Sequence, residues 1–108
     1  MCVEFDMMTE EGFSHARLEA LDTVDAHKLH MFYVIVRSGS IGDAARRMHL
    51  TRSALSHAIR SLERDLGCEL FHRHDRSITL TPCGHKLMPL AESILRKMAS
   101  LREEMSAP

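Results

Sequence analysis

The stretch AARRMHLTRSALSHAIRSLERDLG, residues 44–67, has the pattern of two helices joined by a tight turn. Thr51 follows the turn and is suited to cap the second helix, because its hydroxyl accepts an N–H of the first turn. Gly67 is suited to end that helix, because glycine readily adopts the left-handed conformation. The sequence therefore predicts a short helix over 41–48 and a longer helix over 52–66, in a helix-turn-helix arrangement.

The helix predicted for 52–66 has two unlike faces. At 100° per residue, its apolar residues form one narrow stripe that must face a core. This stripe consists of Leu55, Ile59, Leu62 and Leu66. The opposite face consists of Ser53, Ser56, His57, Arg60 and Arg64. Its N-terminal half carries no acid, so this half is suited to approach the edges of DNA bases in a major groove.

The flanking sequence predicts the rest of a small domain. Apolar residues at helical spacing predict a helix over 25–39, and two short strand-like runs near 69–71 and 78–80 predict a hairpin. Thr81 and Pro82 then begin a helix that extends to about residue 104, with Pro89 expected to kink it or weaken its first turns. The expected fold class is mainly α: a winged helix-turn-helix, with three helices and a two-stranded β wing, followed by a long linker or dimerisation helix. A further short helix is expected near 13–21.

The charges of this chain are unevenly distributed along it. Its 14 Lys and Arg and 15 Asp and Glu give a formal net charge of −1. Residues 1–24 hold six acidic residues and one arginine, whereas residues 37–76 hold eight arginines and five acidic residues. Because the basic segment contains the predicted helix-turn-helix, the near-neutral total does not exclude a nucleic-acid ligand.

Composition excludes several classes of protein. No run of 18 apolar residues is present, so no membrane span is predicted, and the N-terminus lacks the pattern of a secretory signal. The three cysteines, Cys2, Cys68 and Cys83, are odd in number and irregularly spaced. We expect reduced thiols in a cytoplasmic protein, with Cys68 and Cys83 as small buried side chains rather than a redox pair.

Catalytic and metal chemistry have weak support in the sequence. Potential zinc ligands fall within residues 68–85, but no CxxC pair or zinc-finger spacing is present. These potential ligands are Cys68, His72, His74, Cys83 and His85. A glycine-rich phosphate loop, paired carboxylates and a nucleophile–base set are also lacking. We therefore predict no metal, no cofactor and no enzymatic activity.

From residue 29 to about 101, the chain resembles the DNA-binding domain of LysR-type transcriptional regulators. The features that carry this resemblance are Phe32, GSIGDAARRMHLTRSALSHAIRSLERDLGCELFHR (39–73) and RSITLTPCG (76–84). The resemblance implies a winged helix-turn-helix that binds double-stranded DNA at imperfect inverted repeats, as a homodimer joined through its linker helix. It also implies that a C-terminal effector-binding domain, through which a small-molecule effector would act, is absent from this chain.

The resemblance also implies roles for individual residues. The residues implied to contact DNA are Thr51, Arg52, Ser53, Ser56, His57 and Arg60 on the third helix and Arg73 and Arg76 on the wing. The residues implied to form the dimer interface are Leu87, Leu90, Ile94, Met98 and Leu101. Arg52, Ser53, His57 and Ala58 stand where the family often has other residues, so the resemblance does not fix which bases this chain prefers.

Three segments follow from these patterns: an acidic arm over 1–24, the DNA-binding domain over 25–80 and the linker helix over 81–108. The arm is expected to be a leader without a role of its own, to cover the basic face, or to contact a partner. The alternative to a sequence-specific DNA binder is a winged-helix module for protein contacts. The lack of acids on the outer half of the third helix favours DNA.

Overall fold

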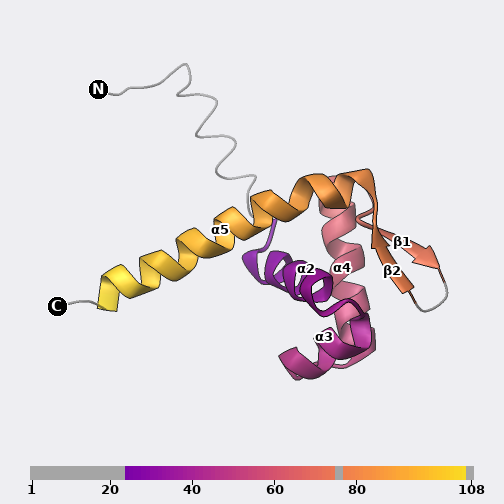
Figure 1. Ribbon diagram of the computed structural model, residues 1–108, viewed down its shortest axis with the longest axis horizontal. Coiled ribbons are helices and arrows are strands. Elements are labelled where there is room, and N and C mark those ends of the chain that lie inside the picture. Colours follow the sequence, from indigo (N-terminus) through magenta and orange to yellow (C-terminus); the bar gives the residue numbers. More distant parts are fainter. Residues whose placement is uncertain (1–23, 75–76, 107–108) are drawn as a thin grey trace, which may run out of the picture.

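A computed structural model of the chain describes residues 24–74 and 77–106. The elements, in chain order, are α2 (Ala26–Ser38), α3 (Ile41–Met48), α4 (Arg52–Leu66), β1 (Phe71–His74), β2 (Ser77–Leu80) and α5 (Pro82–Ser106). The three shorter helices pack together beside the hairpin, and the C-terminal half of α5 extends away from them (Figure 1). This arrangement confirms the predicted fold class. The helix expected near 13–21 lies outside the described residues.

The helix boundaries are set by local side-chain and backbone geometry. The carboxylate of Asp25 accepts the N–H of His27 at the start of α2. The hydroxyl of Ser40 accepts the N–H of Asp43 at the start of α3. Gly39 and Gly67 end α2 and α4 with φ of 85° and 78°, in the left-handed region that favours glycine. The predicted bounds of α3 and α4 are therefore confirmed.

The core lies where α2, α3 and α4 meet the root of the wing. Its largest fully buried side chains are Phe32, Ile35, Leu55, Ile59, Leu62, Leu70 and Phe71. The rings of Phe32 and Phe71 lie 5.5 Å apart between centroids, so the first residue of β1 packs on α2. The apolar stripe predicted for α4 is thus the face that the core covers.

The wing is a two-stranded antiparallel hairpin in which Phe71 pairs with Leu80 and Arg73 with Ile78. Its first strand begins two residues later than the prediction near 69–71. The reason is local: the N–H of Leu70 donates to the carboxylate of Glu63 on α4 at 2.8 Å, instead of to a neighbouring strand.

Helix α5 begins close to the wing root and passes through Pro89 without ending. Gly84 lies in its first turn, where a Cβ would come within 2.3 Å of the carbonyl oxygen of Leu70. Only a residue without a side chain allows this approach of α5 to the chain that leads into β1. The predicted start of the helix at Pro82 is confirmed, and its end lies two residues beyond the expected one.

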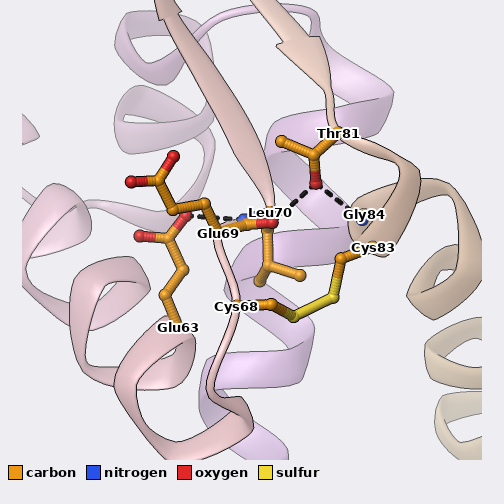
Figure 2. The surroundings of a disulfide bond; sticks show 7 residues. All are labelled: Glu63, Cys68, Glu69, Leu70, Thr81, Cys83 and Gly84. Carbon is orange, nitrogen blue, oxygen red and sulfur yellow. Dashed lines mark hydrogen bonds between the residues drawn. A yellow bond between two sulfur atoms is a disulfide. The ribbon is translucent and has the colours of Figure 1, made fainter.

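Cys68 and Cys83 are joined by a disulfide, with their Cα atoms 6.7 Å apart. This corrects the expectation of two reduced thiols. Cys68 follows the end of α4, and Cys83 lies in the first turn of α5. The hairpin between them brings the start of α5 back beside the end of α4, so the two cysteines meet (Figure 2). Irregular spacing along the sequence gave no sign of this proximity in space. Among residues 24–74 and 77–106, no helix is long and apolar enough to span a membrane.

Candidate nucleic-acid interface

The turn between α3 and α4 is compact and closed by hydrogen bonds. His49 has a φ of 57°, and the N–H of Leu50 donates to the carbonyl oxygen of Ala45 at 2.9 Å. The hydroxyl of Thr51 accepts the N–H of Ala54 at 3.0 Å and so caps α4. Ala44 and Ala45 are buried, and their small side chains let α3 lie close to its neighbours. These contacts fix the orientation of α4 relative to α3 in a helix-turn-helix.

The outer face of α4 gathers the hydrogen-bonding side chains that the sequence predicted for it. Ser53, His57 and Arg60 are exposed, and Ser56 is half-buried. Serine hydroxyls, an imidazole and a guanidinium can all donate hydrogen bonds to base edges or phosphates. The structure therefore brings together, on one accessible face, four of the residues singled out from the sequence.

Arg52 lies at the edge of this face. It is exposed, and a Cβ built on Gly42 of α3 would lie 3.0 Å from its Nη2 atom. The guanidinium therefore extends over the first turn of α3. A cation next to a helix N-terminus makes this end of the motif suitable for an anion such as phosphate.

The two wing arginines named from the sequence differ in what the structure describes. Arg73 on β1 donates through Nη2 to Oε1 of Glu63 at 2.6 Å, so its guanidinium is turned toward α4. Arg76 lies outside the described residues. The wing projects beside α4, on the side opposite the C-terminal end of α5 (Figure 1).

Glu63 makes contacts between α4 and the wing that the sequence did not predict. Its side chain is only 9% exposed, and its two oxygens accept from Leu70 and Arg73. In the sequence, Glu63 is one of the two acidic residues in the C-terminal half of the helix predicted for 52–66. The sequence does contain an indication that Glu63 is partly buried. Glu63 follows Ile59 by four residues and therefore lies one helical turn further along, at the edge of the apolar stripe.

Helix α5 presents an exposed apolar face. Leu90, Ile94, Met98, Leu101 and Met105 are large hydrophobic side chains between 43% and 73% exposed. Leu87, also named for the dimer interface, is half-buried and packs against the core. On the polar side, Glu92 accepts a hydrogen bond from Arg96 at 3.0 Å, and this bond, followed by the charge of Glu92, raises the pKa of Arg96 above its usual value.

The structure bears on the residues that were weighed as zinc ligands. Within residues 24–74 and 77–106, no group of three or more His, Cys, Asp or Glu is placed to hold a metal ion. Two of the five candidates, Cys68 and Cys83, are instead bonded to each other.

Two solved structures of DNA-binding domains in complex with DNA are similar to this chain. A complex of the CbnR DNA-binding domain with DNA matches with a TM-score of 0.72 and 28% identity, over 76% of this chain and 94% of that one. A complex of the BenM DNA-binding domain with DNA of catB site 1 matches with a TM-score of 0.71 and 28% identity, over 74% and 86% of the two chains. Both of these similar domains were thus solved bound to DNA.

Comparison with curated proteins points to the same class. The HTH-type transcriptional regulator HdfR of Salmonella newport is 40% identical over 83 residues, which make up 77% of this chain and 30% of that protein. This chain therefore spans less than a third of the length of the curated relatives it matches. The family model for bacterial regulatory helix-turn-helix proteins of the lysR family matches residues 26–85, more than half of the chain. The chain belongs to the LysR family of transcriptional regulators, as a DNA-binding winged helix-turn-helix domain and not as an enzyme.

Proposed function

We propose that this chain binds double-stranded DNA in a sequence-specific manner, with α4 in the major groove. The observation that carries this proposal is the division of α4 into a buried apolar face and an accessible, acid-free face at its N-terminal half. On this proposal the base edges are read by Ser53, Ser56, His57 and Arg60. Thr51 and Arg52 lie at the start of the helix, where phosphate contacts fix its register.

The wing extends the interface beyond the major groove. We place it, with Arg73 and Arg76, against the adjacent minor groove or its phosphates. Residues 25–80 form the DNA-binding domain on this division of the chain, residues 81–108 the linker helix, and residues 1–24 an acidic arm. The chain would act in the cytoplasm, without a cofactor.

Dimerisation through α5 is the second part of the proposal. Its exposed stripe of Leu90, Ile94, Met98 and Leu101 recurs at spacings of three and four residues, as in helices that pack in pairs. Leu87 would contribute from the end of the stripe nearest the core. Two copies related by a two-fold axis would present two α4 helices, so the preferred site is an imperfect inverted repeat. A small-molecule effector would act only through a further C-terminal domain, as in a longer regulator.

A module for protein contacts alone is the competing function. Such a module would tolerate acids on the outer face of α4, whereas Ser53, His57 and Arg60 are all neutral or basic. The similarity to two domains solved with DNA also favours nucleic acid as the ligand.

Fluorescence anisotropy tests the proposal with two duplexes, one selected from random sequence and one scrambled. We expect the selected duplex to bind about a thousand-fold more tightly, with affinity falling steeply as salt rises. Equal binding to the two duplexes would contradict sequence-specific readout. Absence of binding to both would favour the module for protein contacts.

A further inference from the structure

The guanidinium of Arg73 is directed toward a nearly buried carboxylate on α4. Its Nη2 lies 2.6 Å from Oε1 of Glu63, and the side chains of Arg73 and Glu63 are 32% and 9% exposed. A charge-assisted bond of this length is stronger than a bond between neutral groups. Because Glu63 is almost removed from water, losing Arg73 would leave an uncompensated buried charge, which is strongly unfavourable.

The second oxygen of Glu63 holds the segment that leads into the same strand. Oε2 accepts the N–H of Leu70 at 2.8 Å, and Leu70 itself is fully buried. Figure 2 shows this bond between the end of α4 and the chain that enters β1. One carboxylate on α4 therefore holds the wing at two positions, Leu70 and Arg73.

The packing of Phe71 on α2 holds a different part of the wing from the one that Glu63 holds through Arg73. Phe71 packs on Phe32 of α2 and anchors the root of the strand in the core. Arg73 lies two residues further along, on the same side of the strand, where the hairpin leaves the core. The ion pair thus acts on the direction in which the wing projects from α4.

We propose that Glu63 is a positioning residue for DNA binding, which holds Arg73 in an internal ion pair and so fixes the wing relative to α4. On this inference Arg73 supports the wing from within, in place of the phosphate contact proposed for it above, and neutralisation of phosphate falls to other residues. This inference rests on the proposed DNA-binding function. Glu63 itself touches no DNA.

If Arg73 binds phosphate instead of Glu63, removal of Glu63 should change the DNA affinity in the opposite direction. If Arg73 leaves Glu63 to neutralise a phosphate, Glu63 is a negative charge close to DNA, and its removal should strengthen binding. If Glu63 positions the wing, its removal should weaken binding. The variant Glu63→Gln distinguishes the two, because glutamine has the same shape and still accepts the N–H of Leu70, but carries no charge for Arg73.

The control is Glu92→Gln on α5. Glu92 also forms an ion pair with an arginine, Arg96, and its replacement changes the net charge by the same amount. Glu63→Gln should weaken affinity for the selected duplex about tenfold, a typical coupling between directly paired residues, while Glu92→Gln should leave it unchanged. In footprints, Glu63→Gln should lose the protection of the minor groove beside the site and keep that of the major groove.

A second variant, Arg73→Gln, adds the dependence on salt. If Arg73 only supports the wing, Arg73→Gln should keep the wild-type slope of log affinity against log salt. The double variant Glu63→Gln/Arg73→Gln should bind the selected duplex no more weakly than either single variant. A slope lower by about one would identify a lost phosphate contact and overturn the proposal. Tighter binding by Glu63→Gln, or an unchanged footprint, would overturn it as well.

Amide hydrogen exchange in the free protein separates this inference from the proposed function. In Glu63→Gln, we expect faster exchange along β1 and β2, with Leu70, α2 and α3 unchanged. Wild-type protein that binds neither duplex would refute DNA binding, and with it a positioning role in binding. Unchanged exchange in the wing would refute the anchoring by Glu63 whatever the DNA result.

Discussion

The hydroxyl of Thr81 donates a hydrogen bond to the carbonyl oxygen of Glu69 at 2.6 Å, and so joins the start of α5 to the chain that enters the wing. The hydroxyl oxygen of Thr81 also accepts the N–H of Gly84 at 3.0 Å and so caps α5 (Figure 2). Thr81 is buried, so water does not replace these two bonds when they are lost.

Thr81→Val should therefore lower the free energy of unfolding by about 1–3 kcal/mol, because it keeps the shape of the side chain and removes both bonds. Urea denaturation measures the change. Thr79→Val, at an exposed position of β2, is the control and should stay within about 0.5 kcal/mol of the wild type. A Thr81→Val variant as stable as the wild type would show that the hydroxyl adds nothing to the junction.

Two glycines should respond differently to replacement by alanine. At Gly84 a Cβ would meet the backbone oxygen of Leu70 at 2.3 Å, so Gly84→Ala should lower stability by about 1–3 kcal/mol or more. At Gly42 it would meet only the mobile end of Arg52, at 3.0 Å, and Gly42→Ala should leave stability unchanged or raise it by up to about 1 kcal/mol. Thermal denaturation of the two variants makes the comparison, and equal losses would contradict it.

The parts of this fold that the sequence predicted best are those set by neighbouring residues. Ser40, Thr51 and Gly67 act on the backbone within a few positions, so the bounds of α3 and α4 could be read from the chain. Spacing on the helix likewise predicted that Leu55, Ile59 and Leu62 are buried, which the structure confirms.

The parts that the sequence did not predict depend on contacts formed only in the folded domain. The start of β1 shifts because Leu70 is bound by Glu63, seven residues away. The pairing of Cys68 with Cys83 requires the complete hairpin between them. On the candidate interface, the accessible face of α4 followed from spacing, whereas the orientation of Arg73 toward Glu63 did not.

Arg60 is the most direct test of base reading on α4. Arg60→Ala should weaken binding of the selected duplex by about 1–3 kcal/mol, with a smaller effect on the scrambled duplex. The control is Arg64→Ala, which removes an exposed arginine one turn further from the start of the helix and should affect the two duplexes alike. Anisotropy titrations give both affinities. Equal losses for Arg60→Ala on the two duplexes would indicate a phosphate contact instead.

The disulfide should stabilise the domain without being required for its fold. Cys68 and Cys83 are separated by 15 positions, and closing a loop of this length contributes about 3 kcal/mol through the unfolded chain. Reduction of the wild type should lower its stability by about that amount, while the double variant Cys68→Ser/Cys83→Ser should not respond to reductant. Identical unfolding of the wild type with and without reductant would contradict the bond.

The apolar stripe of α5 is tested by the oligomeric state. Ile94→Glu should raise the dissociation constant of the proposed dimer at least about tenfold, because it would place a charge in an apolar interface. Ser93→Glu introduces the same charge at the preceding, exposed position and should have little effect. Sedimentation equilibrium measures both. A dimer that tolerates the charge at Ile94 would locate the interface elsewhere.

The bond between Glu63 and Leu70 also bears on the order in which the domain folds. Its two partners are only seven residues apart, so the chain loses little entropy when this loop closes. Pairing of β1 with β2, by contrast, also requires the chain to reverse direction between them and Phe71 to pack on α2. We therefore expect the root of the wing to form together with the end of α4, so that the hairpin grows from a point already fixed beside that helix.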